Sequence, residues 1–482
     1  MRGLVSDLSD RACYAFTTAF LKCFAKEARS IIIGHDLRPS SPGITQACIA
    51  GIIDSGRDVV YVGALPTPAI AYHAALNALP ALVVTGSHIP FDRNGIKFYR
   101  VDGEMTKEDE VAMMACEVEV PEVVESGALP DVEKRAKELY VQRYLEFFGP
   151  GALSGMRIAV YEHSSVARDV VREILEKLGA EVVSLGRTET FVPIDTEAVS
   201  PEDVAQAHEW AREVGFDAIV STDGDGDRPL IGDEQGEWLR GDVVGILCAQ
   251  YLGATAVVTP VSCNTAVESA LLGPGNGKPE SSGRSSCSED GAFCSVQVVR
   301  TRIGSPYVIA GMEAVETDGV VVGYEANGGF LLGSDVERDG NVLKALPTRD
   351  AVLPMLVVLS MARERGCKVS EVTDWLPERY TASDRLKNVP SDWSQKFIGQ
   401  LQGNPQEMRE LLGPGSGEIV RVDMTDGLRV TFENTDIVHL RPSGNAPELR
   451  CYIEAGSVER ARELCEGALG RLQRFIDTLE IY

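Results

Sequence analysis

The segment Asp223-Gly224-Asp225-Gly226-Asp227-Arg228 directly follows an apolar run, Ala218–Ser221, that predicts a buried strand. The ends of such strands are where α/β proteins place their ligands. Three carboxylates at alternate positions can converge on one hard divalent cation, and the intervening glycines let the backbone fold tightly around it. The segment therefore predicts an α/β fold with a metal site, with Mg²⁺ as the first candidate ion. A solvated acidic turn is the alternative. The loop does not fit an EF-hand, which is another way in which alternating aspartates bind a cation.

Short apolar strands alternate with helical stretches on both sides of this segment. Strands are predicted at residues 30–34, 58–62, 81–85, 157–161, 181–185, 256–259 and 319–323, and helices at 42–56, 131–148 and 165–178. Strands separated by helices imply crossover connections and parallel or mixed sheets. Residues 419–452 instead alternate in polarity before a helix at 458–479, which predicts an antiparallel sheet with helices.

Breaks in this pattern divide the chain of 482 residues, which is long enough for about three or four domains. Gly149-Pro150-Gly151 ends the first α/β unit, and a third unit begins near Ala254. Residues 273–291 are rich in Gly, Ser and Pro, which favours a surface loop or insertion without chemistry.

The composition limits the class of protein. Hydrophobic residues make up 44% and charged residues 24%, as in soluble globular proteins. The formal charge of −26 disfavours nucleic acid as a partner, so an anionic substrate would need a local cluster of arginines and a metal. We expect no membrane span and no signal peptide, and the 11 scattered cysteines are typical of reduced cytoplasmic thiols.

A second motif, Thr85-Gly86-Ser87-His88-Ile89-Pro90, also follows an apolar strand. Ser87 at this corner can present a nucleophilic hydroxyl, although a simple turn is the alternative and the motif is not G-x-S-x-G. Together with a distant metal loop, a phosphorylated serine would be both a metal ligand and a phosphoryl donor. Lys97 is either a surface lysine or a group that stabilises charge or exchanges a proton beside a phosphate.

A third motif, Gly323–Gly329, places Glu325 and Asn327 on the same side of an extended segment. A carboxylate and an amide suit two neighbouring sugar hydroxyls, and a glycine-rich turn is the alternative. A fourth motif, Arg441–Arg450, combines arginine, serine, glycine and asparagine around one turn. This combination predicts a phosphate cradle, with a plain turn between two strands as the alternative.

These four segments, in this order, resemble the α-D-phosphohexomutase superfamily, which includes phosphomannomutases and phosphoglucomutases. The resemblance covers nearly the whole chain. It implies an α/β fold of four domains, namely three related α/β units with mixed sheets and a C-terminal α+β domain with an antiparallel sheet. We place these domains at residues 1–150, 151–252, 253–368 and 369–482.

The resemblance also implies an activity and its cofactors. The enzyme would interconvert hexose 1-phosphate and hexose 6-phosphate through a phosphoserine and a bisphosphorylated sugar, with Mg²⁺ and with hexose 1,6-bisphosphate as activator. The residues around Ser87 and Glu325 look more like those of phosphomannomutase-type members, which favours mannose over glucose. Phosphoglucomutase, phosphoglucosamine mutase, a phosphosugar hydrolase and a phosphosugar-binding protein without turnover remain alternatives. We expect a monomer or homodimer in the cytoplasm.

The residue roles follow from the same resemblance. Ser87 matches the phosphoserine, and Ser87, Asp223, Asp225 and Asp227 match the metal ligands. Lys97 is the first candidate for proton exchange and His88 the second. The substrate-binding residues would be Arg2, Arg38, Arg228, Glu325, Asn327, Arg441, Ser443, Gly444, Asn445 and Arg450.

The chain departs from the family pattern at three places. It begins at Met1-Arg2-Gly3, so that the strand expected before the arginine is missing. Gly329 stands where many members carry a histidine, which removes a proposed proton-transfer partner. Residues 273–291 match no family segment.

Overall fold

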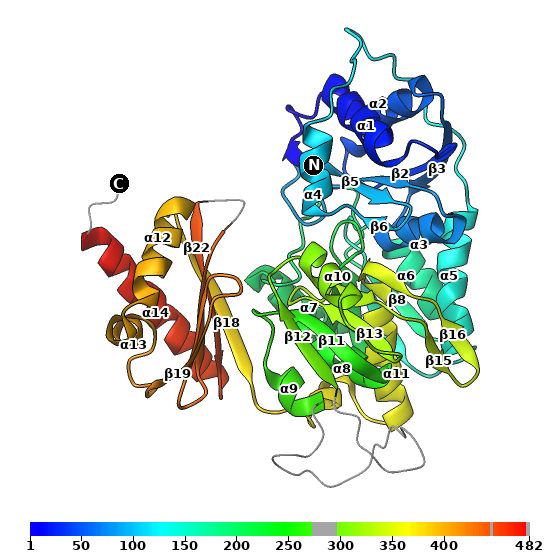
Figure 1. Ribbon diagram of the computed structural model, residues 1–482. Helices are drawn as coiled ribbons and strands as arrows, with labels where there is room; N and C mark the ends of the chain where they lie inside the picture. Colours follow the sequence, from blue (N-terminus) through cyan, green and yellow to red (C-terminus); the bar gives the residue numbers. More distant parts are fainter. Residues whose placement is uncertain (272–295, 444–446, 479–482) are drawn as a thin grey trace. The chain divides into compact units, whose positions relative to one another are not determined.

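The computed structural model describes residues 1–271, 296–443 and 447–478 (Figure 1). The predicted loop at 273–291 and the predicted site residues Gly444 and Asn445 lie outside these residues. The chain forms two compact units, residues 1–257 with 309–374 and residues 258–308 with 375–482. In the parts of the chain that the structure describes, no helix is both long and apolar enough to cross a membrane.

The first sheet of unit 1 is mixed, as predicted. Its strand order is β1-β5-β4-β2-β3, with β6 paired to β5. The strands are β1 Arg2–Leu4, β2 Ser30–His35, β3 Asp58–Ala64, β4 Ala81–Val84, β5 Arg93–Arg100 and β6 Gly103–Glu104. Strand β2 is parallel to β3 and β4, whereas β5 is antiparallel to β4. The helices are α1 Asp10–Phe24, α2 Ser41–Asp54, α3 Thr67–Asn77 and α4 Lys107–Met114.

The first residues of the chain form a short edge strand of this sheet. Residues 2–4 themselves form the edge strand β1, in which Arg2 lies opposite Gly95 of β5. The amino group of Met1 also donates a 2.9 Å hydrogen bond to the Ile96 carbonyl. Arg2 is therefore held in the first sheet, in register with the strand that carries Lys97.

The second sheet of unit 1 has the order β10-β9-β7-β8. Its strands are β7 Arg157–Tyr161, β8 Glu181–Leu185, β9 Ala218–Thr222 and β10 Pro229–Gly232, and its helices are α5 Arg135–Phe148, α6 Arg168–Lys177 and α7 Pro201–Val214. Helix α5 begins four residues later than predicted, after Glu133, whose N–H donates to the carbonyl of Tyr61 in β3. Helix α6 begins three residues later, because Ser165 Oγ accepts from Ala167 N–H in a turn.

The remaining elements of unit 1 include an antiparallel arrangement of β13 Val320–Tyr324, β14 Phe330–Leu332 and β17 Leu346–Asp350. A hairpin of β15 Val336–Arg338 and β16 Asn341–Leu343 follows β14. Helices α8 Gly241–Tyr251 and α11 Val352–Arg365 are apolar almost all round and are buried, which is why they lack the one-sided pattern that predicts a surface helix. The short η1 Val369–Thr373 follows α11.

Four elements lie at or beyond the division between the units: β11 Ala254–Pro260, α9 Ala266–Leu271, β12 Gln297–Thr301 and α10 Ser305–Glu313. The C-terminal region of unit 2 is the antiparallel sheet that the sequence predicted, with the order β18-β22-β21-β20-β19. Its strands are β18 Tyr380–Lys387, β19 Ile419–Asp423, β20 Leu428–Phe432, β21 Ile437–Pro442 and β22 Glu448–Ala455. Helices α12 Ser391–Gln402, α13 Pro405–Leu412 and α14 Val458–Thr478 cover one face (Figure 1) and share its apolar core.

Candidate active site

The serine loop, Thr85–Pro90, begins where the buried strand β4 ends. Ser87 is fully buried and has a φ of 52°, a left-handed conformation that costs a non-glycine residue about 1 kcal/mol or more. Its N–H donates to Thr85 Oγ1 at 2.8 Å, and its hydroxyl donates to Asp223 Oδ2 at 2.6 Å. The loop thus holds the Ser87 hydroxyl in one direction, toward the aspartates.

Arg38 holds the serine loop through hydrogen bonds to its backbone. Its terminal nitrogens donate to four backbone carbonyls, those of Ser87 at 2.8 Å, Ile89 at 2.5 Å, Pro90 at 2.7 Å and Arg93 at 2.9 Å. The guanidinium also lies 4.0 Å from the centre of the Phe191 ring, and the residue is only 1% exposed. With these donors used by the loop, the geometry favours a positioning role for Arg38 over the predicted contact with substrate.

The aspartate loop, Asp223–Arg228, connects β9 to β10. The three aspartates are buried, and each offers one carboxylate oxygen within 4.8 Å of the others. A Cβ at Gly224 would lie 2.8 Å from the Ser87 carbonyl oxygen, so the close approach of the two loops requires glycine. Asp225 Oδ1 and Asp227 Oδ1 are buried and accept no hydrogen bond from any residue that the structure describes. Oxygen atoms of this kind fit a small divalent cation.

The second oxygens of Asp225 and Asp227 share one cation. Lys97 Nζ lies 2.7 Å from Asp225 Oδ2 and 2.7 Å from Asp227 Oδ2, and Thr67 Oγ1 donates to Asp225 Oδ2 at 2.7 Å. Burial and the charges of Asp225 and Asp227 raise the pKa of Asp223 well above its ordinary value. Burial alone would raise the pKa of Asp225 too, but the charge and hydrogen bond of Lys97 bring it below its ordinary value.

Three further predicted residues lie in or near the serine and aspartate loops. Arg228 Nε lies 3.6 Å from Asp227 Oδ1, and His88 Nδ1 lies 3.4 Å from Ser87 Oγ. Burial, followed by the positive charge of Arg228, lowers the pKa of His88 to about 3, so its imidazole is neutral near neutral pH. Burial and the charges of Arg228 and Arg349 lower the pKa of Arg2. The structure therefore places His88 beside Ser87 and Arg228 beside Asp227, while Arg2 is close enough to Arg228 and Arg349 to feel their charges.

The Glu325 loop, Gly323–Gly329, is the turn between β13 and β14. Glu325 and Asn327 are both buried, and Asn327 Oδ1 accepts from Gly329 N–H at 2.9 Å, which shapes the turn. Arg349 of β17 donates to Glu325 Oε2 at 3.2 Å and to Asp227 Oδ2 at 2.8 Å. Arg349 was not predicted as a site residue, because an isolated arginine in a strand carries no local signal.

The fourth motif lies in unit 2. Arg441 of β21 lies opposite Arg450 of β22, which in turn lies opposite Arg385 of β18. Directly opposed residues share one face of a sheet, where like charges repel one another, so the row is a candidate site for an anion. Glu448 partly offsets this repulsion, since its carboxylate lies 3.5 Å from Arg385 and 3.8 Å from Arg450. Arg441 also pairs with Asp426 at 2.8 Å, and Ser443 N–H donates to the Glu448 carbonyl at 2.9 Å. Register thus adds Arg385 to the predicted residues Arg441 and Arg450.

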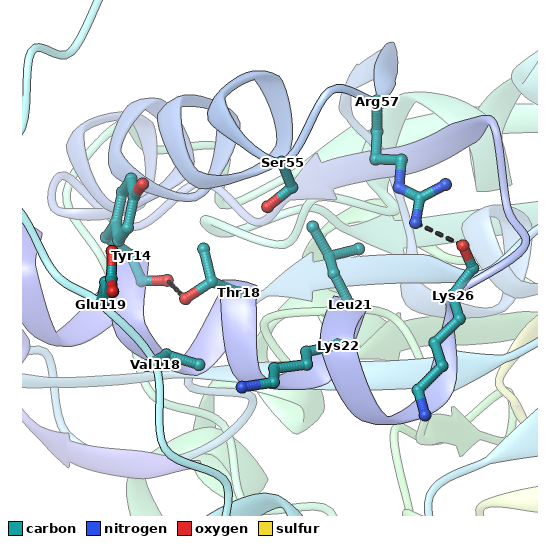
Figure 2. Close-up of a pocket in the computed structure, with 9 residues that line it drawn as sticks. All are labelled: Tyr14, Thr18, Leu21, Lys22, Lys26, Ser55, Arg57, Val118 and Glu119. Carbon is teal, nitrogen blue, oxygen red and sulfur yellow. Dashed lines mark hydrogen bonds between the residues drawn. The ribbon is translucent and has the colours of Figure 1, made fainter.

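A recess of about 470 Å³ lies elsewhere on the first α/β unit (Figure 2). It is lined by Tyr14, Thr18, Leu21, Lys22, Lys26, Ser55, Arg57, Val118 and Glu119, none of which is a predicted site residue. Lys22 donates to the Glu117 carbonyl, and Arg57 donates to the carbonyls of Lys26 and Ala28. Since these basic groups are engaged with the backbone, the recess lacks the convergent chemistry of the serine and aspartate loops.

Comparison with family models assigns four successive parts of the chain. Residues 1–119, 138–236 and 290–380 match the phosphoglucomutase/phosphomannomutase alpha/beta/alpha domains I, II and III, and residues 386–469 match the C-terminal domain of the same family. The chain therefore belongs to the phosphoglucomutase/phosphomannomutase family, within the α-D-phosphohexomutase superfamily. It is a phosphohexomutase, an isomerase of the phosphotransferase type.

Curated relatives and solved structures agree with this assignment. The phosphomannomutase of Salmonella muenchen is 44% identical over 98% of this chain and 94% of its own, and that of Sinorhizobium fredii is 41% identical over 98% and 97%. The phosphoglucosamine mutase of Xanthobacter autotrophicus is 28% identical over 98% and 95%. A crystal structure of a family protein from Burkholderia thailandensis has the same fold, with a TM-score of 0.73 at 19% identity over 98% and 96% of the two chains.

Proposed function

We propose that the protein interconverts mannose 1-phosphate and mannose 6-phosphate through a phosphoserine at Ser87. The observation that carries the proposal is the buried Ser87 hydroxyl, which points at three clustered aspartates 2.6 Å from Asp223. The preference for mannose rests on two phosphomannomutases that are more than 40% identical to this chain.

The reaction would proceed in two balanced half-reactions. In the first, the P–O bond to Ser87 Oγ breaks while a P–O bond to the free sugar hydroxyl forms, which gives a hexose 1,6-bisphosphate. The proton of that hydroxyl ends on Ser87 Oγ, with Lys97 as the first candidate for its transfer and His88, neutral and 3.4 Å from Oγ, as the second. After the sugar has turned around, the other phosphoryl group returns to Ser87. Added hexose 1,6-bisphosphate would activate the enzyme by phosphorylating Ser87.

The remaining side chains would bind and orient the sugar phosphate and the metal ion. Glu325 and Asn327 would accept and donate hydrogen bonds to the sugar hydroxyls, and the arginines at 385, 441 and 450 would bind a phosphate group. Asp223, Asp225 and Asp227, with an oxygen of phosphorylated Ser87, would hold Mg²⁺. When bound, Mg²⁺ supplies charge neutralisation to the transferring phosphoryl group. The buried Asp225 Oδ1 and Asp227 Oδ1 support this assignment.

A coupled assay tests the proposal. Purified protein with Mg²⁺ and a trace of hexose 1,6-bisphosphate would receive the 1-phosphates of mannose, glucose and glucosamine separately. We expect the highest kcat/KM with mannose 1-phosphate, no turnover by Ser87→Ala, and normal turnover by Ser55→Ala, which removes an exposed serine at the end of α2. Mass spectrometry should find phosphate on Ser87 of the wild type.

Each alternative has its own outcome in this assay. A preference for glucosamine or glucose phosphate would move the assignment to another mutase of the family. Release of inorganic phosphate without a 6-phosphate product would indicate a hydrolase. Binding without turnover would indicate a phosphosugar-binding protein.

A further inference from the structure

Arg349 joins the aspartate loop to the Glu325 loop. One terminal nitrogen of its guanidinium lies 2.8 Å from Asp227 Oδ2, and the other lies 3.2 Å from Glu325 Oε2. The residue is only 9% exposed, so solvent screens these two ion pairs little. A planar guanidinium presents two terminal nitrogens from fixed, separated positions, whereas an ammonium is a compact charge whose three donors rotate freely.

The path of the Arg349 side chain passes over Gly329. A Cβ built on Gly329 would lie 2.5 Å from Arg349 Cδ and 2.9 Å from its Cγ, which is closer than carbon atoms can approach. Gly329 N–H is also the donor that shapes the Glu325 loop through Asn327 Oδ1. The absence of a side chain at position 329 therefore leaves the space that the stem of Arg349 occupies.

Strand β17 is anchored in a way that aims Arg349 at the two loops. Thr348 Oγ1 donates a hydrogen bond to Glu104, and Asp350 Oδ1 accepts one from Tyr140 at 2.7 Å. Since successive side chains of a strand point to opposite faces, Thr348 and Asp350 share one face and Arg349 projects from the other. Contacts on one face thus fix the direction of the arginine on the other.

We infer that Arg349 is a positioning residue of the reaction, which holds the Asp227 and Glu325 carboxylates in one arrangement while Gly329 keeps its side-chain space open. The inference rests on the proposed function, because it assigns Asp227 to the metal and Glu325 to the sugar. The bridge explains how the aspartate loop and the Glu325 loop, which belong to different sheets, keep a fixed distance and orientation to each other. Metal and sugar would then be presented to Ser87 in a fixed geometry rather than independently.

A double-mutant cycle tests the inference. Arg349→Ala and Gly329→Ala should each lower kcat/KM at least about tenfold, the lower end of the range for partners of metal ligands. The double variant should match Arg349→Ala within about threefold, because the alanine at 329 no longer meets the arginine stem. Losses that multiply in the double variant would overturn the inference, as would an Arg349→Ala enzyme within about threefold of the wild type.

Two further variants separate the bridging role of Arg349 from the effect of its charge and from general effects of losing an arginine. Arg349→Lys keeps a cation but loses the two separated terminal nitrogens that contact Asp227 and Glu325, so its kcat/KM should stay within about threefold of Arg349→Ala. Full recovery would overturn the bridging role. Arg338→Gln is the matched control, since Arg338 pairs with Glu364 at 2.8 Å and touches neither loop. It should behave as the wild type.

Amide hydrogen exchange provides a readout that does not depend on turnover. In Arg349→Ala and in Gly329→Ala, exchange should become faster in both the Asp223–Arg228 and the Gly323–Gly329 loops, with the rest of unit 1 unchanged. Faster exchange in only one loop would contradict the coupling. If the wild type fails to isomerise any hexose phosphate, the proposed function fails, while the exchange data still decide whether Arg349 couples the loops.

Discussion

The hydroxyl of Ser87 donates a 2.6 Å hydrogen bond to Oδ2 of Asp223, across 136 positions of sequence. A second link runs beside it, because Thr67 N–H donates to the Asp225 carbonyl at 2.9 Å and its hydroxyl donates to Asp225 Oδ2. The serine and aspartate loops are therefore arranged by the protein itself, with two carboxylate oxygens left for a cation. A site of this kind needs little rearrangement to bind a metal.

Metal binding should stabilise the folded protein. At a Mg²⁺ concentration about a hundredfold above the dissociation constant, the free energy of unfolding should rise by about 2.7 kcal/mol. Asp227→Asn should remove most of this gain, whereas Asp339→Asn, at an exposed turn, should retain it. Thermal unfolding with EDTA and with Mg²⁺ measures both. An equal Mg²⁺ effect in the two variants would place the cation elsewhere.

Lys97 should contribute most to the stability of the folded protein when no metal is bound. Its ammonium bridges Asp225 and Asp227, so Lys97→Gln leaves two buried carboxylates facing each other without their shared cation. We expect the free energy of unfolding in EDTA to fall by about 3 kcal/mol, as when one partner of a buried pair is removed. Added Mg²⁺ should recover part of this loss, so its stabilising effect should exceed that in the wild type. Lys344→Gln, which removes an exposed pair with Asp335, is the control.

A substitution at Arg38 should show whether this residue positions the serine loop or contacts the substrate. Arg38→Gln removes hydrogen bonds to four carbonyls of the serine loop and segment 89–93, so the free energy of unfolding should fall by about 3 kcal/mol. Because Ser87 loses its fixed direction, kcat should fall while KM for the sugar phosphate changes less than about threefold. Steady-state kinetics of this variant test the assignment. A rise in KM at unchanged kcat would restore Arg38 as a substrate ligand.

The chemistry of the site was predictable where it is local in sequence. Three aspartates within five positions, or a serine at the end of an apolar run, carry their own signal. The same holds for strands such as β7 and β8, whose predicted bounds agree with the structure because short β-branched runs are flanked by clear breaks. Helices α8 and α11 gave no such signal, because burial on all sides removes the periodicity.

Arg349 and Arg385 could not be predicted, because their environment is created by strand register. Arg385 becomes part of a basic group only when β18 pairs with β22 and β22 with β21. Arg349 becomes a bridge only when β17 lies beside β14. Neither region was predicted as a strand from its sequence. Arg38 differs from both, because its charge is visible in the sequence but the carbonyls that accept its hydrogen bonds are not.

Arg385 should contribute to phosphate recognition. Loss of one charge-assisted hydrogen bond costs about 2 kcal/mol, so Arg385→Gln should raise KM for the hexose phosphate about tenfold to thirtyfold. Arg421→Gln removes an exposed arginine of the same sheet that pairs with Asp423, and its KM should equal that of the wild type. Unchanged KM in Arg385→Gln would show that register alone does not make Arg385 a phosphate ligand.

His439 should make unit 2 sensitive to acid. It is 2% exposed, and burial, with the charges of Arg429 and Arg441, lowers its pKa from 6.5 to about 4, although the Asp426 carbonyl accepts a hydrogen bond from its ring. Between these two values the unfolded chain binds more protons than the folded one, so stability rises with pH through this window and is lost as the pH falls. At about pH 5 the loss relative to pH 7 should be about 2 kcal/mol.

His439→Gln isolates this contribution from the titration of carboxylates. Glutamine retains an N–H donor for the Asp426 carbonyl but has no proton to gain, so the variant should lose about 2 kcal/mol less than the wild type between about pH 7 and about pH 5. Urea unfolding at the two pH values, followed through unit 2, measures the difference. Equal losses in both proteins would mean that His439 is protonated in the folded state without penalty, which its burial beside two arginines argues against.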